Sequence, residues 1–366
     1  MTDATMMGGL PPQVGRNERW MPLFALGFAA GVGAVLAVSM LQTPVSLTDT
    51  LRRDRASIEL PVVPRIPMSL LPTDLSPPPS PVDAADAAPT RVPVPELPAR
   101  DVSAAPVPAF SVASLETEFD ALDYRLADIR AQSSGVPRLV AEAVPGDLEE
   151  IRDIPRRKAV FFKMVLPLVL IANERLEADR ARILDLRAQE ESGQTLNAED
   201  SDWLARQFEL YRVEEGDWDI LLRRVDVVPP SLAMAQAAIE SGWGTSRFAR
   251  EGNALFGQWV WGDDADGIVP EDRVEGMTHK IRAFDTPLQA VMAYIKNLNT
   301  HRAYREFRNI RANLRRQGAG INGMTLAEGL ESYSEKGRDY IDFVRSIISV
   351  NKLRPFDRAR LRDARA

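Results

Sequence analysis

The sequence predicts a mainly α-helical protein with a small β-hairpin lobe, preceded by a transmembrane helix and a proline-rich linker. Three observations favour this fold class. Apolar residues recur at three- and four-residue steps over most of residues 112–350, which is typical of amphipathic helices. Five glycines and short β-prone stretches lie between residues 252 and 284, which indicates strands and turns. An uncharged apolar segment and then a proline-rich one precede the helical body.

The apolar segment runs from Trp20 to Leu41, inside a region with no charged residue between Arg19 and Asp49. As a helix it would be about 33 Å long, enough to cross the hydrocarbon core of a bilayer. We interpret residues 20–41 as a single-pass signal anchor and residues 1–19 as the cytoplasmic N-terminus. A signal peptide cleaved near Ser39 is the alternative, although its apolar core would be unusually long.

The linker covers residues 43–110. Fourteen of the 27 prolines in the chain lie between Pro61 and Phe110. Proline fixes φ and removes a backbone donor, so neither helix nor sheet is expected there. About fifty such residues could extend roughly 150 Å, a reach that suits a tether between a membrane and a distant target.

The helical body begins with an amphipathic pattern over residues 112–129 and a long helical pattern over residues 158–189. Pro167 is expected to kink the second helix, whose apolar stretch is too short for another membrane span. A further helix is expected after Asn197. The helix of residues 230–240 should begin at the prolines before Ser231 and end at the following glycines.

Short strands are expected around residues 258–261 and 278–284, forming the hairpin lobe. Four more helices should follow it. The sequence pattern places them at residues 286–299, 303–316, 325–332 and 339–350.

Composition limits the chemistry. The net charge is −7 and the isoelectric point about 5.2, which argues against a dedicated nucleic-acid binder. The chain has no cysteine and only two histidines, His279 and His301. Disulfides, thiolate metal sites and thiol catalysis are therefore excluded, and no cofactor is expected. Catalysis, if present, should depend on carboxylates. Residues 302–366 hold fifteen basic and eight acidic residues. We interpret them as a solvated basic surface, or as one that attracts anionic wall polymers or lipid headgroups.

Glu240 is the main catalytic candidate. It lies in the last turn of the helix of residues 230–240, where the helix dipole disfavours another negative charge. Trp243, three residues later, could shield the carboxyl from water. Both effects would raise its pKa, as a general acid at neutral pH requires. A tryptophan beside a catalytic glutamate follows the known lysozyme example. A solvated glutamate at a helix end is the alternative.

Four segments share a resemblance. They are AQAAIESGWGTS at residues 235–246, GNALFGQW at 252–259, YIKNLNTHRAYREFR at 294–308 and the RK-FF-LPL-ANE pattern at 157–174. Together they resemble bacterial N-acetylglucosaminidases of the FlgJ-like, lysozyme-related family, and within it the Bax-type proteins of Gram-negative bacteria. The resemblance covers roughly residues 112–355, with a catalytic core at about 225–352. It leaves residues 356–366 as a basic tail.

The resemblance implies a lysozyme-like helical domain that hydrolyses the β-1,4 bond between N-acetylglucosamine and N-acetylmuramic acid in peptidoglycan. It places the general acid at Glu240 and a tyrosine of the active site at Tyr304. It also implies that four motif residues shape the cleft: Trp243, Asn253, Phe256 and Gly257. We therefore expect glycan strands as the partner, no nucleic acid, and a body in the periplasm held at the inner membrane by residues 20–41.

The second carboxylate is open. Related enzymes have a glutamate in a Thr-Glu-Tyr-like context, and this chain has no such tripeptide. Glu271 lies nearest the expected position and Glu275 is the alternative; either could be a solvated hairpin charge. Retaining and inverting hydrolysis both remain open.

The aromatic and histidine residues nearby allow two interpretations each. Trp259 and Trp261 could stack on sugar rings or pack the lobe. His279 is expected at the surface of a strand, and His301 is expected to cap a helix or line the groove. A non-catalytic wall-binding scaffold and a muramidase or lytic transglycosylase on the same fold are the alternative functions.

Overall fold

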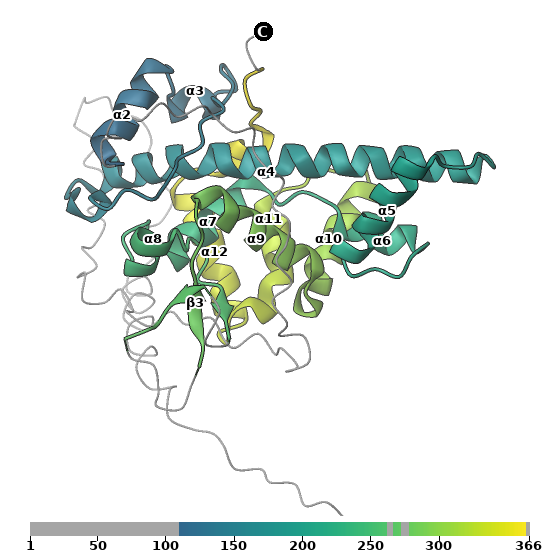
Figure 1. Cartoon of the computed structure of the whole chain (residues 1–366). Coiled ribbons are helices and arrows are strands. Elements are labelled where there is room, and N and C mark those ends of the chain that lie inside the picture. Colours follow the sequence, from purple (N-terminus) through teal and green to yellow (C-terminus); the bar gives the residue numbers. More distant parts are fainter. Residues whose placement is uncertain (1–109, 262–265, 272–277, 364–366) are drawn as a thin grey trace, which may run out of the picture. The chain divides into compact units, whose positions relative to one another are not determined.

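The computed structural model describes residues 110–261, 266–271 and 278–363. The expected anchor and almost all of the expected linker lie outside these residues. Within the described part, no helix is both long and apolar enough to cross a bilayer. The described body is mainly helical and carries one small sheet (Figure 1), as the sequence predicts.

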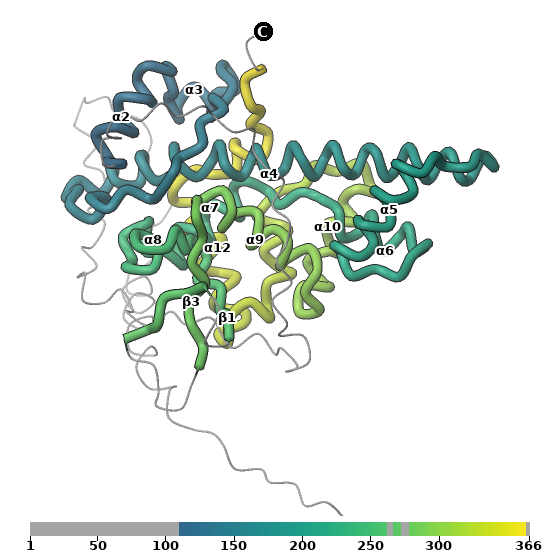
Figure 2. Tube along the Cα trace, in the orientation of Figure 1, coloured from purple at the N-terminus to yellow at the C-terminus, as the bar shows by residue number. Residues whose placement is uncertain are grey.

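The longest element in the described part of the chain is α4 (Ile154–Glu191). It runs between α2 (Val112–Ala121) and α3 (Leu126–Arg130) on one side and most of the later helices on the other (Figure 2). The Asp153 side chain caps its first turn by accepting a hydrogen bond from the Arg156 amide. Its apolar stretch is buried and packs against α2, α7 (Pro230–Glu240) and α9 (Pro287–Thr300). The helix continues through Pro167, so the expected kink does not interrupt it.

The segment before α4 holds three short elements, α2 (Val112–Ala121), α3 (Leu126–Arg130) and η2 (Leu148–Glu150). The sequence predicts one helix over residues 112–129. This prediction was wrong, because the segment forms two helices. The chain turns between α2 and α3, where Asp123 has φ 45°. The Tyr124 backbone amide donates to the Phe119 carbonyl in this turn. The apolar pattern survives the turn because Phe119, Tyr124 and Ile129 are all buried.

The far half of α4 carries α5 (Ala198–Leu210) and α6 (Trp218–Arg224). Asn197 caps α5 by accepting from the Asp200 amide at 2.9 Å, as its place in the sequence predicts. Asp200 also pairs with Arg182 of α4 at 2.6 Å.

The centre of the body is α7 (Pro230–Glu240), whose first ten residues are all buried. It packs against α4 and α12 (Arg338–Val350), and against α11 (Gly323–Leu326) and η5 (Arg354–Arg358). The Asp357 carboxylate accepts from the amide and the hydroxyl of Ser231, each at 2.8 Å. A residue from the end of the chain thus caps the start of this central helix.

The β-lobe follows the short helix α8 (Arg247–Gly252). Its strands are β1 (Trp259–Val260), β2 (Gly267–Ile268) and β3 (Lys280–Arg282). They form an antiparallel sheet in the order β1-β3-β2, with Ile281 opposite Trp259 on one side and Ile268 on the other. The two expected strands are confirmed, and β2 is an additional one.

The remaining elements follow the β-lobe in the sequence. They are α9 (Pro287–Thr300), η3 (Arg302–Tyr304), α10 (Arg305–Arg316), α11 (Gly323–Leu326), η4 (Ala327–Tyr333), α12 (Arg338–Val350) and η5 (Arg354–Arg358). The four expected helical segments are confirmed, although the third is mostly 3₁₀ helix.

The expected basic tail at residues 356–366 was wrong for the residues that the structure describes. Phe356 is fully buried, and Leu361 forms a parallel bridge with Val136. Arg362 donates to the Leu122 and Asp123 carbonyls at 2.6 and 3.2 Å. Residues 356–362 therefore belong to the folded body, because Phe356 lies in the core and Arg362 binds backbone carbonyls.

Candidate active site

Glu240 is the last residue of α7 and the one member of that helix that is partly exposed. The apolar residues before it fix the helix in the core. The Ser241 hydroxyl accepts from the Gly244 amide at 2.8 Å and donates to the Ala237 carbonyl at 2.6 Å, which closes the turn after the helix. The Glu240 side chain therefore lies at the end of a rigid support.

A chain of hydrogen bonds orients the Glu240 carboxyl. The Tyr340 hydroxyl donates to Glu240 Oε1 at 2.7 Å. Gln236, one turn earlier on α7, donates from Nε2 to the Tyr340 hydroxyl at 2.9 Å. The Tyr294 hydroxyl donates to Gln236 Oε1 at 2.5 Å. Three elements, α7, α9 and α12, thus fix one carboxyl oxygen.

Four tyrosines lie around this carboxyl: Tyr294, Tyr304, Tyr333 and Tyr340. Tyr333 stacks on Tyr340 with ring centroids 5.2 Å apart, and Tyr304 lies 5.8 Å from Tyr333. Burial, with the nearby charge of Glu240 as a further cause, raises the pKa of each tyrosine above its ordinary value. The hydroxyls therefore remain protonated and serve as donors at neutral pH.

Burial raises the pKa of Glu240 to about 7, while the hydrogen bond from Tyr340 acts in the opposite direction. A desolvated carboxylate is costly, so the protonated form gains relative to water. Near pH 7 a large fraction of Glu240 therefore carries a proton while remaining partly exposed. This combination suits a general acid.

The expected shielding of Glu240 by Trp243 is not what the structure shows. The Trp243 ring packs on Phe161 and Phe162 of α4, with centroids at 6.1 and 5.3 Å. The Lys158 ammonium lies 4.4 Å above the same ring. Glu240 instead faces α12, so Trp243 fixes the turn after α7 to α4.

Asn253 ends α8 in the left-handed conformation, with φ 53°. Its Oδ1 accepts from the Val144 amide at 2.9 Å, and its Nδ2 donates to the Phe284 carbonyl at 2.9 Å. These bonds join three chain segments at the base of the β-lobe. The structure thus gives Asn253 a supporting role, and its expected contact with substrate stays a prediction.

Phe256 and Gly257 lie between Asn253 and β1. Phe256 is buried and stacks face to face on Tyr294, with centroids 3.9 Å apart. Gly257 has φ 57°, a conformation that favours glycine. Phe256 therefore supports the tyrosine that begins the hydrogen-bond chain to Glu240.

Trp259 is half-buried in β1 and stacks on His279, with centroids 4.4 Å apart. His279 is buried, so its expected surface position was wrong. Because His279 covers one face of the Trp259 ring, a sugar could stack only on the other face. Trp261 lies 6.0 Å from Trp259 at a tilted angle.

Glu271 lies in the turn after β2 with 80% of its side chain exposed. It pairs with Arg247 of α8 at 3.2 Å. In the described part of the chain, no hydrogen bond or ion pair connects Glu271 to Glu240 or to the four tyrosines. Glu275 lies outside the described residues, so the identity of the second carboxylate stays a prediction.

Tyr304 is placed as expected, among the tyrosines around Glu240. Its hydroxyl bonds to Asn297 of α9. His301 Nδ1 accepts from the Ala303 amide at 3.3 Å and caps η3, which confirms the capping interpretation of that histidine. The cap fixes the short turn that carries Tyr304.

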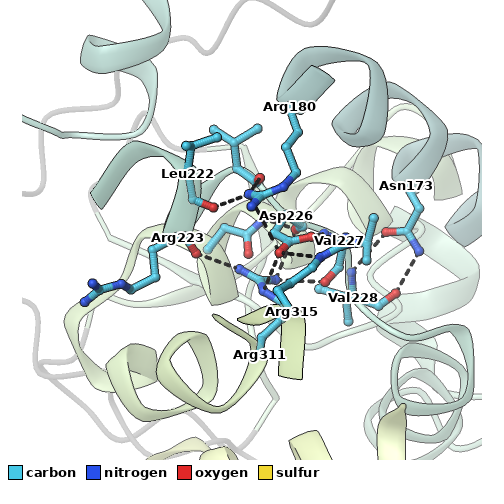
Figure 3. Close-up of polar contacts among 11 residues, drawn as sticks. Asn173, Arg180, Leu222, Arg223, Asp226, Val227, Val228, Arg311 and Arg315 are labelled. Atoms are coloured by element: carbon cyan, nitrogen blue, oxygen red, sulfur yellow. Dashed lines mark hydrogen bonds and ion pairs between the residues drawn. The ribbon is translucent and has the colours of Figure 1, made fainter. Parts of the chain in front are cut away.

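A buried ionic cluster fixes the segment that enters α7 (Figure 3). Asp226 is 2% exposed and pairs with Arg315 at 2.6 Å and with Arg180 and Arg311 at 3.8 Å. Burial opposes the ionisation of Asp226, but the three arginines outweigh it and keep its pKa below the usual value. The cluster joins α4 and α10 to the start of the central helix.

Comparisons with known proteins show the family of the chain. The family described as mannosyl-glycoprotein endo-β-N-acetylglucosaminidase, a glucosaminidase family, matches residues 218–353. Protein bax of Escherichia coli (strain K12) is 30% identical over 216 residues, which cover 57% of this chain and 76% of that protein. The chain belongs to the Bax-type glucosaminidase family. No solved structure matches it significantly.

The glucosaminidase match extends from the first residue of α6 to just beyond α12. It therefore contains Glu240 and all four tyrosines. The Bax-type resemblance suggested only Tyr304 as an active-site tyrosine. The sequence does not distinguish Tyr294, Tyr333 and Tyr340 as site residues, because each also fits the apolar face of its own helix.

Proposed function

We propose that this chain is a peptidoglycan hydrolase that cleaves the β-1,4 bond between N-acetylglucosamine and N-acetylmuramic acid. The observation that carries the proposal is Glu240, a partly exposed residue at the end of a buried helix whose carboxyl has its pKa raised to about 7. Membership of a glucosaminidase family supports the class of bond.

In this mechanism, Glu240 donates its proton to the glycosidic oxygen as the bond breaks. Tyr340 holds one carboxyl oxygen, so the other is the proton donor. A second carboxylate, Glu271 or Glu275, activates water or stabilises the oxocarbenium-like centre. The face of Trp259 opposite His279 and the segment around Asn253 bind the glycan.

The proposal extends to location. Residues 20–41 anchor the protein in the inner membrane, and residues 43–110 let the catalytic body reach the wall in the periplasm. The uncharged apolar segment and the proline content of the sequence support this arrangement.

The decisive experiment digests purified peptidoglycan with the full chain, reduces the products and identifies the new ends by mass spectrometry. We expect reduced N-acetylglucosamine ends from the wild type. Glu240→Gln should lower the rate at which these ends form by at least about a thousandfold. Circular dichroism should show that the variant keeps its fold. Glu118→Gln, at an exposed glutamate of α2, is the matched control and should retain full activity.

Other products would change the assignment. Reduced or anhydro N-acetylmuramic ends would identify a muramidase or a lytic transglycosylase. Glycan binding without any new ends would identify a wall-binding scaffold. Wild-type turnover by Glu240→Gln would show that the general acid is another residue.

The same digestion can choose the second carboxylate. Glu271→Gln and Glu275→Gln should differ, with only the true partner losing activity. The anomer that forms first, followed by NMR, then separates retaining from inverting hydrolysis.

A further inference from the structure

The turn after Glu240 has a strained backbone. Gly242, Trp243 and Gly244 follow one another with φ 58°, 63° and 78°. Glycine adopts this left-handed region readily, whereas a residue with a Cβ atom adopts it only at a cost in free energy. The Trp243 amide donates to the Ala238 carbonyl at 2.9 Å, which ends α7 as in a Schellman motif. The end of the helix that carries Glu240 therefore depends on a strained tryptophan.

The side chain of Trp243 offsets this cost through its contacts with α4. Its ring meets Phe161 and Phe162 edge to face, and the Lys158 ammonium lies 4.4 Å from the ring centroid. The face of an indole ring attracts a cation, and the attraction is stronger where water is excluded. Lys158 is half-buried, so this contact is partly shielded from solvent.

Lys158 also binds the end of α12. Its Nζ donates to Asn351 Oδ1 at 3.3 Å, and Asn351 Nδ2 donates to the Ile347 carbonyl at 2.9 Å. Asn351 directly follows α12, the helix that carries Tyr340. In the described part of the chain, Lys158 forms no ion pair with a carboxylate. One ammonium thus joins the turn after Glu240 to the helix that holds the Glu240 carboxyl.

These contacts give a role to a segment that the glucosaminidase match leaves out. The match begins at Trp218, whereas Lys158, Phe161 and Phe162 belong to the RK-FF pattern near the start of α4. The segment approaches the turn closely, because a Cβ atom added at Gly244 would lie 3.2 Å from the Phe161 ring. This part of α4 therefore supports the end of α7 as well as filling the core.

We propose that Lys158 is a positioning residue, which fixes the Glu240 carboxyl for proton transfer by holding Trp243 in its left-handed conformation. The reaction that it serves rests on the proposed function. Without the ammonium, fewer contacts offset the cost of the Trp243 backbone, so the turn should open more often. Glu240 and Tyr340 would then be aligned less often. A small misplacement of an acid lowers the rate of the chemical step more than it weakens binding of the substrate.

The first measurement follows the turn itself and needs no hydrolysis. The Trp243 and Gly244 amides both donate hydrogen bonds within the turn, so their hydrogen exchange in the full chain reports its opening. We expect Lys158→Met to speed this exchange about tenfold, because a partly desolvated cation–π contact is lost. Lys158→Arg should restore slow exchange, since a guanidinium can stack on the indole and still donate to Asn351.

The second measurement is the kinetics of cleavage of soluble glycan strands. Lys158→Met should lower kcat about tenfold and leave KM nearly unchanged. If the lysine acts through the tryptophan, Lys158→Met should lower kcat no further in a Trp243→Leu chain. Thermal melts should show that each variant keeps its fold.

Lys163→Met is the matched control. Lys163 lies on the same helix, and its ammonium is 4.9 Å from the centroid of the Phe119 ring. The substitution thus removes the same kind of contact at a place that does not touch the turn. Exchange of the Trp243 and Gly244 amides and kcat should both stay at the wild-type values.

Four results would overturn the proposal. Unchanged exchange in Lys158→Met would show that the ammonium does not hold Trp243. Faster exchange with unchanged kcat would show a contact that is only structural. Equal effects of Lys158→Met and Lys163→Met would show general stabilisation by charges on α4. A full further loss of kcat in the Trp243→Leu chain would show that Lys158 acts by another route.

The hydrolase proposal can fail separately. If the wild type cuts no strand while Lys158→Met speeds exchange of the turn and Lys163→Met does not, the proposed reaction is wrong and the support of the turn by Lys158 stands.

Discussion

Glu240 illustrates how one residue acquires its chemistry from distant parts of the chain. Its helix end and the turn after it are local features, and the sequence predicts both. The groups that surround its carboxyl come from α9, η3, η4 and α12. Tyr340, its hydrogen-bond donor, lies 100 positions away, so no local pattern could identify the contact. The same limit explains why the expected shielding of Glu240 by Trp243 was wrong. Trp243 is close to Glu240 in the sequence, but its ring packs on α4.

The pH dependence of activity follows from this environment. A general acid works only while protonated, so activity should fall as pH rises through the Glu240 pKa of about 7. Tyr340→Phe removes the hydrogen bond that lowers this pKa. We therefore expect the alkaline limb of kcat/KM to move to higher pH, with the rate reduced about tenfold because the carboxyl is less well oriented. A pH profile of soluble glycan release measures both effects.

A control separates orientation from general loosening of the site. Trp261→Phe alters an aromatic residue of the β-lobe that forms no hydrogen bond with Gln236, Tyr294 or Tyr340. The alkaline limb of kcat/KM of this variant should stay in place. An unmoved limb in Tyr340→Phe, or one moved to lower pH, would contradict the role given to Tyr340.

At the scale of elements, α7 is held at both ends by residues from other helices. Asp357 of η5 caps its first turn and also accepts from the Gly323 amide of α11 at 3.0 Å. The central helix therefore depends on a carboxylate near the end of the chain. Because this contact spans 126 positions, the sequence predicts the helix itself but not the residue that caps it.

Asp357→Ala should destabilise the fold. It leaves the buried amide and hydroxyl of Ser231 and the Gly323 amide without their acceptor. Losing such bonds should lower the free energy of unfolding by about 2–4 kcal/mol. Urea denaturation followed by circular dichroism measures this. Asp363→Ala, at an exposed residue of the same segment, should change stability by less than about 0.5 kcal/mol; equal losses would show that the cap is unimportant.

The elements differ in how far the sequence predicts them. The helices after residue 286 have strong periodicity and local caps, such as Thr286, which accepts from the Gln289 amide. Strand β2 has two residues, too few to show any alternation. Asp123 reverses the chain within an uninterrupted apolar pattern, and this explains why residues 112–129 resemble a single helix.

At the scale of the whole molecule, the two ends of the described body are bound together. The Val136 amide donates to the Arg360 carbonyl at 2.8 Å, and the Arg362 amide donates to the Val136 carbonyl at 2.7 Å. Composition suggests a solvated tail here, because arginines are frequent in residues 354–362. Composition cannot show that Arg362 binds backbone carbonyls, since that contact depends on the completed fold.

A truncation tests this closure. A chain that ends at Pro355 loses Phe356, Asp357 and the pairing with Val136. We expect its melting temperature to fall by more than about 10 °C, or the protein to be insoluble, because a core aromatic alone contributes about 3–5 kcal/mol. A chain that ends at Asp363 keeps these contacts and should melt with the full chain. Equal melting of the two truncated chains would mean that the C-terminal segment is dispensable.

The hydrogen-bond chain at Glu240 has a consequence for proton supply. Every donor in it points toward the carboxyl, and its middle member is the Gln236 side-chain amide. An amide of this kind does not readily accept one proton and release another. These hydrogen bonds thus orient Glu240 but do not conduct its proton into the core. After each bond cleavage, the Glu240 carboxyl must therefore regain its proton from the water that enters the site when the product leaves.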